Sequence, residues 1–166
     1  MAIDRIEFFT LDTLSATAPE EQVQLNVLKQ VARYPDAFRL VFFHLPADVR
    51  LHAKHALINH WKNEYEIQSI NIADFTRQLI EAIHKGTWLS DMNRYQESEI
   101  LLVDDWQLIT GKDSTQESFY VSVLKPRLEK KVLTVIFSEK GYTELSPVLR
   151  DDLRNLLRLG FHEEDA

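Results

Sequence analysis

Several histidines have the residue type and spacing for chemistry. His52 and His55 are spaced i, i+3, and His44 and His60 lie nearby, a pattern that suits a metal site. No carboxylate completes a facing set of ligands. We therefore interpret these histidines as structural and expect no bound metal.

A hydrolase triad and an acidic pair are two further possibilities. Ser138, His84 and Asp104 have the residue types of a triad, but the sequence has no G-x-S-x-G turn, which argues against a hydrolase. Asp104 and Asp105 follow directly on the apolar run of residues 100–103. Because carboxylates are common at strand ends, the pair alone does not define a site.

Short apolar runs alternate with longer amphipathic stretches, and these elements must position the side chains above. Runs without polar alternation indicate strands buried on both faces. Their alternation with helices predicts a three-layer α/β domain with a parallel sheet and helices on both faces. Strands are expected at residues 40–43, 66–72, 100–103 and 132–137. Helices are expected at residues 20–34, 49–63, 73–84, 115–130 and 144–159. Ligands bind at the carboxyl ends of such strands, so we expect a site in the loops after the first and third strands.

The composition narrows the class of protein. With 166 residues, of which 45% are hydrophobic, the chain is expected to form a single domain, residues 1–166. The absence of cysteine excludes disulfides, thiolate metal sites and a cysteine nucleophile. The net charge of −7 opposes binding to duplex DNA and to anionic membranes. Since neither a leader nor a membrane-spanning pattern is evident, we expect a cytoplasmic protein.

Three motifs resemble those of a known family. Residues 100–119, ILLVDDWQLITGKDSTQESF, resemble the Walker B strand and following helix of the AAA+ domain of the bacterial replication initiator DnaA. Residues 74–83, DFTRQLIEAI, and residues 9–14, FTLDTL, resemble two further motifs of this family. The resemblance covers about residues 8–161 and implies a P-loop-NTPase-like AAA+ core. It also implies that Asp104 and Asp105 stand where Walker B has its metal-coordinating and catalytic acids.

The segment in place of the family's phosphate-binding loop differs from G-x-x-x-x-G-K-[ST] at all four signature positions. His44 and Val49 stand for the glycines, Arg50 for the lysine, and Leu51 for the hydroxyl that binds Mg²⁺. Side chains at the two glycine positions oppose close approach of the backbone to a phosphate. The resemblance therefore implies a relic site, with no bound cofactor.

Two neighbours of these positions also oppose phosphate binding. Pro46 removes an N–H group from the loop that would surround the phosphates. Asp48 is expected to N-cap the helix that begins at residue 49, which would place a carboxylate at the anion site. We expect this site to be filled by the chain itself.

Other parts of the family's ATPase machinery are altered too. Leu156 stands in the place of the arginine finger, and its neighbours Arg154 and Arg158 do not match the motif. Glu139 occupies a sensor-like position. We expect neither the helical lid nor the helix-turn-helix domain of the family, and hence no recognition of duplex DNA.

We therefore expect a catalytically inactive DnaA-like AAA+ core that acts as a protein-interaction or regulatory module in DNA replication initiation. Its expected partner is a protein, such as the initiator or the helicase-loading machinery. A nucleotide-independent homodimer, anchored by Trp88 or Trp106, stays open. The alternatives are an accessory protein that binds nucleotide or single-stranded DNA at a remodelled site and, less favoured, an active ATPase.

A contact with single-stranded DNA would fall at about residues 85–95, the place of the family's initiator-specific insertion. Lys85, Trp88 and Arg94 offer the cations and the aromatic face that such contacts use. The interpretation that we favour is a solvated helical hairpin with Trp88 packed on the domain, because positive charge is sparse.

The substitution at position 50 leads to a geometric prediction. The loops that carry Arg50 and Asp104 leave neighbouring strands, so the guanidinium should pair with the carboxylate directly or through one water. In the alternative, Pro46 and Asp48 redirect the loop. Arg50 would then lie in solvent, and backbone N–H groups or His44 would cap Asp104.

Overall fold

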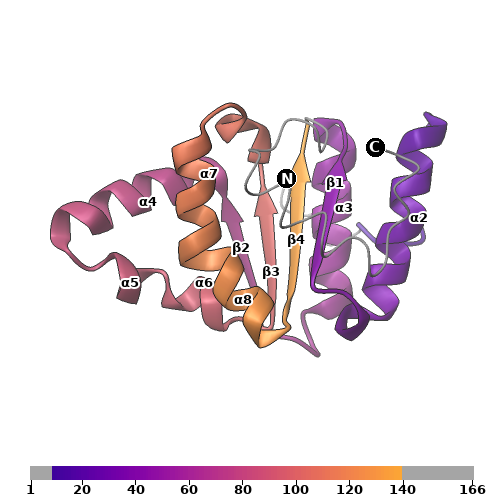
Figure 1. Ribbon diagram of the computed structural model, residues 1–166. Helices are drawn as coiled ribbons and strands as arrows, with labels where there is room; N and C mark the ends of the chain where they lie inside the picture. The colour runs from indigo at the N-terminus through magenta and orange to yellow at the C-terminus, as the bar shows by residue number, and fades with distance from the viewer. Residues whose placement is uncertain (1–8, 140–166) are drawn as a thin grey trace, which may run out of the picture.

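The computed structural model describes residues 9–139. Within this range the chain forms a parallel four-stranded sheet in the order β1-β4-β3-β2. The strands are β1 Leu40–His44, β2 Ile67–Asn71, β3 Ile100–Asp104 and β4 Leu133–Ser138. Their carboxyl ends therefore meet along one edge of the sheet, at the top of Figure 1.

Helices cover both faces of the sheet (Figure 1). One face carries α2 Pro19–Arg33 and α3 Ala47–Trp61. The other carries α4 Ile72–Lys85, α5 Trp88–Asp91, α6 Asn93–Glu97, α7 Asp113–Phe119 and α8 Lys125–Lys130. Shorter turns are η1 Pro35–Ala37, η2 Trp106–Ile109 and the π-helical η3 Tyr120–Leu124. None of the helices in the described range is long and apolar enough to cross a membrane.

Each strand divides its side chains between two cores. In β3, Leu101 and Val103 pack with α4 and α7, whereas Ile100 and Leu102 pack with α2 and α3. This burial on both faces explains why the strand segments lack polar alternation. The three-layer α/β fold predicted from the sequence is confirmed.

The predicted elements differ from the observed ones mainly at their ends. β1 and β3 each extend one residue beyond the predicted runs, and α3 begins two residues earlier than the predicted helix 49–63. The helix predicted at residues 115–130 is α7, η3 and α8 in succession. The helix predicted at residues 144–159 lies outside the described residues.

A proline explains the π-helical segment between α7 and α8. Pro126 has no N–H group, so it cannot donate to the carbonyl of Ser122 four residues earlier. Gln96 Nε2 donates to Ser122 O instead, at 2.6 Å. The wider turn is thus stabilised by a side chain from α6.

The ends of α4 are well defined, but its apolar residues are not all buried. Asn71 Oδ1 accepts from Ala73 N at 2.8 Å, and Gly86 ends the helix in a left-handed conformation with φ 69°. Ile80 and Ile83 are 53% and 58% exposed, respectively, so part of the apolar pattern of this helix faces solvent.

A buried arginine connects α8 with α6, the residues just before β3 and the start of β4. Arg127 is 0% exposed and has no carboxylate partner among the described residues. Burial lowers its pKa to about 10. Its guanidinium donates to the carbonyls of Tyr95, Ser98 and Leu133 and to the hydroxyls of Ser98 and Thr134. Nothing in the spacing of Arg127 along the sequence distinguishes it from a surface arginine.

Candidate functional site

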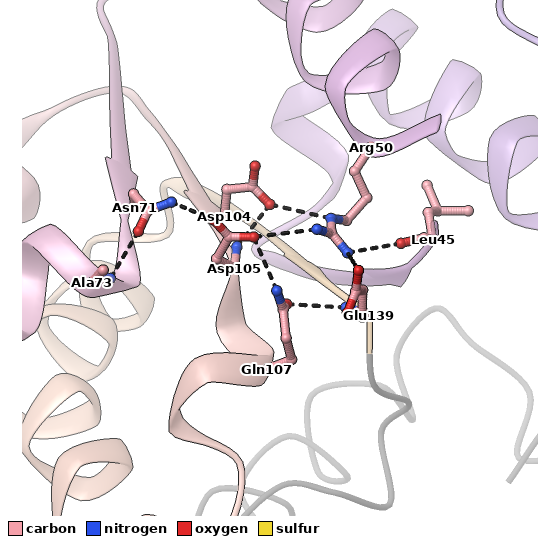
Figure 2. A network of polar contacts seen from close by, with 8 residues as sticks. All are labelled: Leu45, Arg50, Asn71, Ala73, Asp104, Asp105, Gln107 and Glu139. Carbon is pink, nitrogen blue, oxygen red and sulfur yellow. Dashed lines mark hydrogen bonds and ion pairs between the residues drawn. The ribbon is translucent and has the colours of Figure 1, made fainter. Parts of the chain in front are cut away.

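The carboxyl ends of β1, β3 and β4 converge on a cluster of charged side chains (Figure 2). Asp104 ends β3 and Asp105 follows it, whereas Glu139 directly follows β4. Arg50 comes from the first turns of α3, which begins just after β1. The prediction that Arg50 and Asp104 lie on loops of neighbouring strands was wrong, because β4 lies between β1 and β3. The side chain of Arg50 contacts the acids at the end of β3 and Glu139 after β4.

Arg50 lies at the centre of this cluster and is only 5% exposed. Its Nη1 donates to Leu45 O at 3.0 Å and lies 3.7 Å from Glu139 Oε1. Its Nη2 donates to Asp105 Oδ1 at 3.2 Å. Its Nε lies 3.5 Å from Asp104 Oδ1, an ion pair without hydrogen-bond alignment. The predicted pairing of Arg50 with Asp104 is confirmed, but the hydrogen bond goes to Asp105.

The carboxylate of Asp105 is occupied on both oxygens. Oδ1 accepts from Arg50 and from Gln107 Nε2, the latter at 3.0 Å, and Oδ2 accepts from Asn71 Nδ2. Asp105 has φ 61°, a left-handed conformation that aspartate tolerates better than most residues. Asp104 Oδ1 accepts from the backbone N–H of Asp105 at 2.7 Å. Groups of the chain itself thus contact both oxygens of Asp105 and Oδ1 of Asp104.

The loop after β1 leads directly into α3 without a side-chain cap. Pro46 is the N-cap, with φ −59° and ψ 157°, and the helix begins at Ala47. The prediction that Asp48 caps the helix was wrong: Pro46, whose φ is fixed near the helical value, is the N-cap, and the helix begins two residues earlier than predicted. Asp48 still lies in the first turn, where a carboxylate interacts favourably with the helix dipole.

The last residue of β1 is held by a side chain from α2. His44 N donates to Gln24 Oε1 at 2.8 Å, and Gln24 Nε2 donates to His44 O at 3.0 Å. Sequence reasoning missed Gln24, since a glutamine within a helix carries no signal of such a role. The pair fixes the start of the segment that stands in place of a phosphate-binding loop.

The family model of the bacterial DnaA ATPase domain matches residues 7–164. The chain belongs to this family.

This chain matches only part of the length of its relatives in the DnaA family. A chromosomal replication initiator protein DnaA from Symbiobacterium thermophilum is 34% identical over 115 residues, which are 67% of this chain and 24% of the relative. One from Thermodesulfovibrio yellowstonii is 33% identical over 99 residues, 60% of this chain and 22% of the relative. The chain thus spans about a quarter of these relatives.

Solved structures share the fold. A replication initiator DnaA bound to AMPPCP and single-stranded DNA has a TM-score of 0.75 at 20% identity, covering 88% of this chain and 47% of that one. Domain III of DnaA from Thermotoga maritima has a TM-score of 0.74 at 18% identity, covering 86% and 62%. The DnaC helicase loader has a TM-score of 0.64 at 18% identity, covering 94% and 89%.

The residues of this DnaA-family chain do not fit the Mg²⁺ ion that the family's Walker motifs would hold. Position 51 is a leucine, 48% exposed, where a hydroxyl would bind the metal. Oδ1 of Asp104, at the metal-coordinating position, accepts from Asp105 N and lies 3.5 Å from Arg50 Nε. The oxygens of Asp105 are occupied by Arg50, Gln107 and Asn71. Within residues 9–139, no three histidine, aspartate or glutamate side chains are grouped to bind a metal.

The side chains predicted for single-strand contacts lie on α4, α5 and α6. Lys85 is exposed, and Trp88 packs partly buried against the core, as the favoured interpretation predicted. Arg94 Nη2 donates to Gln78 Oε1 at 2.8 Å and to the hydroxyl of Tyr95 at 2.6 Å. Unlike Arg94, the side chains of Lys85 and Trp88 make no hydrogen bond or ion pair within residues 9–139.

The histidines of α3 serve as packing groups for the segment before α2. His52 stacks on Phe9 with ring centroids 4.5 Å apart, and its Nε2 lies 3.1 Å from Thr13 Oγ1. His55 also contacts Phe9, at 6.2 Å. Burial, followed by the charge of Lys54, lowers the pKa of His55.

The remaining predictions concern Trp106 as a dimer anchor and the position of the arginine finger. Trp106 is 1% exposed and packs edge-to-face on Phe119, so it cannot anchor a homodimer as predicted. Its burial follows from the turn after β3, which directs the ring under α7. The arginine-finger position, Leu156, and its neighbours Arg154 and Arg158 lie outside the described residues.

Proposed function

We propose that this chain is a DnaA-family AAA+ core that neither binds nor hydrolyses ATP and acts through protein contacts in replication initiation. The observation that carries this proposal is the position of Arg50. A single buried guanidinium contacts the loop after β1, both acids after β3 and the sensor-like Glu139. These are the loops that a metal-bound nucleotide would otherwise connect.

The electrostatics of the cluster also support a site without nucleotide. Three carboxylates surround one guanidinium, so the cluster has an excess of two negative charges. Phosphates approaching this edge without a metal would meet net repulsion at short range. The donors of Arg50 point at protein oxygens, and the remaining loop has a proline where a backbone N–H would face a phosphate.

Nucleotide titrations test this proposal. ATP and ADP with Mg²⁺, at millimolar concentration, should leave the melting temperature of the protein unchanged, because ligand binding would raise it by mass action. Isothermal calorimetry should show no heat of binding, and phosphate release should match the blank. A nucleotide-dependent shift that disappears in Asp104→Asn would contradict the proposal.

The proposed partner is a component of the replication machinery. Relatives named as chromosomal replication initiators and the shared fold with the DnaC helicase loader support this partner class. An affinity-tagged protein should capture the initiator or a helicase loader from cells of its own species, and the yield should not change with ATP. Capture that requires ATP would contradict the nucleotide-independent mode.

Single-stranded DNA binding is the alternative, because one structural neighbour is a DnaA bound to single-stranded DNA. In this chain the guanidinium of Arg94 is engaged by Gln78 and Tyr95, and Trp88 packs on the core. That leaves Lys85 as the free cation of the three. Fluorescence anisotropy with a labelled oligonucleotide should therefore show only weak, salt-sensitive binding.

A further inference from the structure

A hollow separate from the Arg50 cluster is lined by residues of α2, of α3 and of the segment 9–14. It has a volume of about 410 Å³, within the range of pockets that hold small molecules. Its walls include Arg33 at the end of α2 and His60 in the last turn of α3. Because α3 runs back from the carboxyl edge of the sheet, its last turn lies toward the opposite edge.

Two cations of this hollow have no carboxylate partner within the described part of the chain. Lys29 and Arg33 both line it, and neither has a carboxylate within ion-pair distance among residues 9–139. The guanidinium of Arg50 and the ammonium of Lys130, by contrast, are paired. The C-terminal ends of the helices favour cations at this place. They do not explain why two unpaired cations and a histidine line one hollow.

The segment before α2 closes one side of the hollow. Phe9 O accepts from Asn59 Nδ2 at 3.0 Å, and the Phe9 ring stacks on His52. Leu14, at the end of the segment, is 1% exposed. These contacts anchor both ends of the segment, and residues 10–12 between them line the hollow.

The lining groups match a particular class of ligand. Lys29, Arg33 and His60 can hold a dianion, since arginine and lysine are the usual partners of phosphate groups. Asp12 offers an acceptor for hydroxyl groups, and Leu11 and Ala56 offer apolar surface. We propose that this hollow binds a small phosphomonoester that also carries hydroxyl groups, such as a sugar phosphate or a nucleoside monophosphate.

The test compares three probes on the full chain by isothermal calorimetry: inorganic phosphate, ribose 5-phosphate and AMP. Ribose 5-phosphate should bind more tightly than inorganic phosphate, because only the sugar phosphate reaches Asp12. Comparison with AMP distinguishes a sugar phosphate from a nucleotide as the ligand class. Amide NMR shifts on binding should concentrate in residues 10–12 and 56–60.

Variants assign the binding to this hollow. Lys29→Ala with Arg33→Ala should weaken ribose 5-phosphate binding by at least about tenfold, since two charge-assisted contacts are lost. The matched control, Lys62→Ala with Lys112→Ala, removes the same charge from exposed positions outside the hollow and should leave the affinity unchanged. Asp12→Asn should reduce the preference for ribose 5-phosphate over inorganic phosphate. All five positions are exposed or half-buried, so circular dichroism should show folded variants.

Two results would overturn the proposal. One is the absence of binding of all three probes at millimolar concentration, in which case the cations serve only the helix ends. The other is equal binding in the Lys29, Arg33 variant and in the matched control. Neither result bears on the proposal that the Arg50 cluster binds no ATP, because the two sites share no residue.

Discussion

The guanidinium of Arg50 stands between the ends of three strands and is almost fully removed from water. A buried charge is tolerated only when other groups compensate it. Asp104 and Asp105 supply the compensating charges, and Leu45 O accepts a further hydrogen bond. Losing the guanidinium would leave these acids facing one another without a cation, so this residue is the main stabilising element of the site.

Replacing Arg50 should destabilise the fold clearly. Arg50→Ala is expected to lower the free energy of unfolding by about 3 kcal/mol, because one partner of a buried charge cluster is removed. Urea denaturation followed by circular dichroism measures this loss. The matched control is Arg77→Ala, whose exposed pair with Asp74 at 3.0 Å should contribute about 0–1 kcal/mol. Equal losses in the two variants would refute the role given to Arg50.

His55 gives the fold a dependence on pH. Its pKa in the folded protein lies below the ordinary value of 6.5, because burial disfavours the charged ring. The unfolded chain therefore binds the proton more readily, and stability is lost as the pH falls below that value. The decrease in the free energy of unfolding between about pH 7.5 and about pH 5.5 should be smaller in His55→Gln than in the unaltered protein. Urea denaturation at both pH values measures it, and identical losses would contradict this assignment.

At the Arg50 site, some contacts could be predicted from the sequence and others could not. The contact of Arg50 with Asp104 was predictable because both follow or end parallel strands at the same edge of the sheet, although β4 lies between those strands. The hydrogen bond to Asp105 depends on the left-handed backbone at that residue, with φ 61°. Gln107 and Asn71 join the site only because of that turn. No spacing rule anticipates such a local conformation in a residue other than glycine.

Among the elements, the strands could be predicted from the sequence, but the division of the helix after β3 into α7, η3 and α8 could not. Strand runs buried on both faces leave an apolar signal that is hard to confuse with a loop. The π-helical turn of η3 depends on Pro126 together with Gln96, which lies thirty positions earlier in the sequence. A contact between distant residues decides this local structure, and periodicity alone does not contain it.

Arg127 should be essential to the junction between α8, α6 and the starts of β3 and β4. Its guanidinium satisfies three carbonyls and two hydroxyls. Arg127→Lys keeps the charge but has fewer donors, which are not arranged in a planar fork. We expect it to lower the free energy of unfolding by about 2–3 kcal/mol, since buried acceptors lose their partners. Chemical denaturation measures this, with the exposed Arg77→Lys as control; equal stabilities would show that the junction does not need the fork.

At the scale of the whole molecule, the proposal predicts assembly that is independent of nucleotide. If the Arg50 cluster binds no nucleotide, as proposed, the chain has no bound nucleotide to present to a neighbouring copy. Light scattering should therefore give the same molar mass with and without ATP and Mg²⁺. A homodimer, if one forms, must use surfaces other than Trp106, which is buried. ATP-dependent growth of the assembly would contradict this prediction.

The contact between Gln24 and His44 also sets a limit on how the sheet can grow. Leu45 N donates to Ser138 O and Arg39 O accepts from Thr134 N, so the odd-numbered residues of β1 direct their backbone groups toward β4. The even-numbered residues then face the outer edge, where the amide of Gln24 already occupies both groups of His44. Any additional strand, from this chain or from another, can pair only with Leu40 and Phe42. The side-chain amide of Gln24 thus limits how many residues of β1 could hydrogen-bond to a strand added at this edge of the sheet.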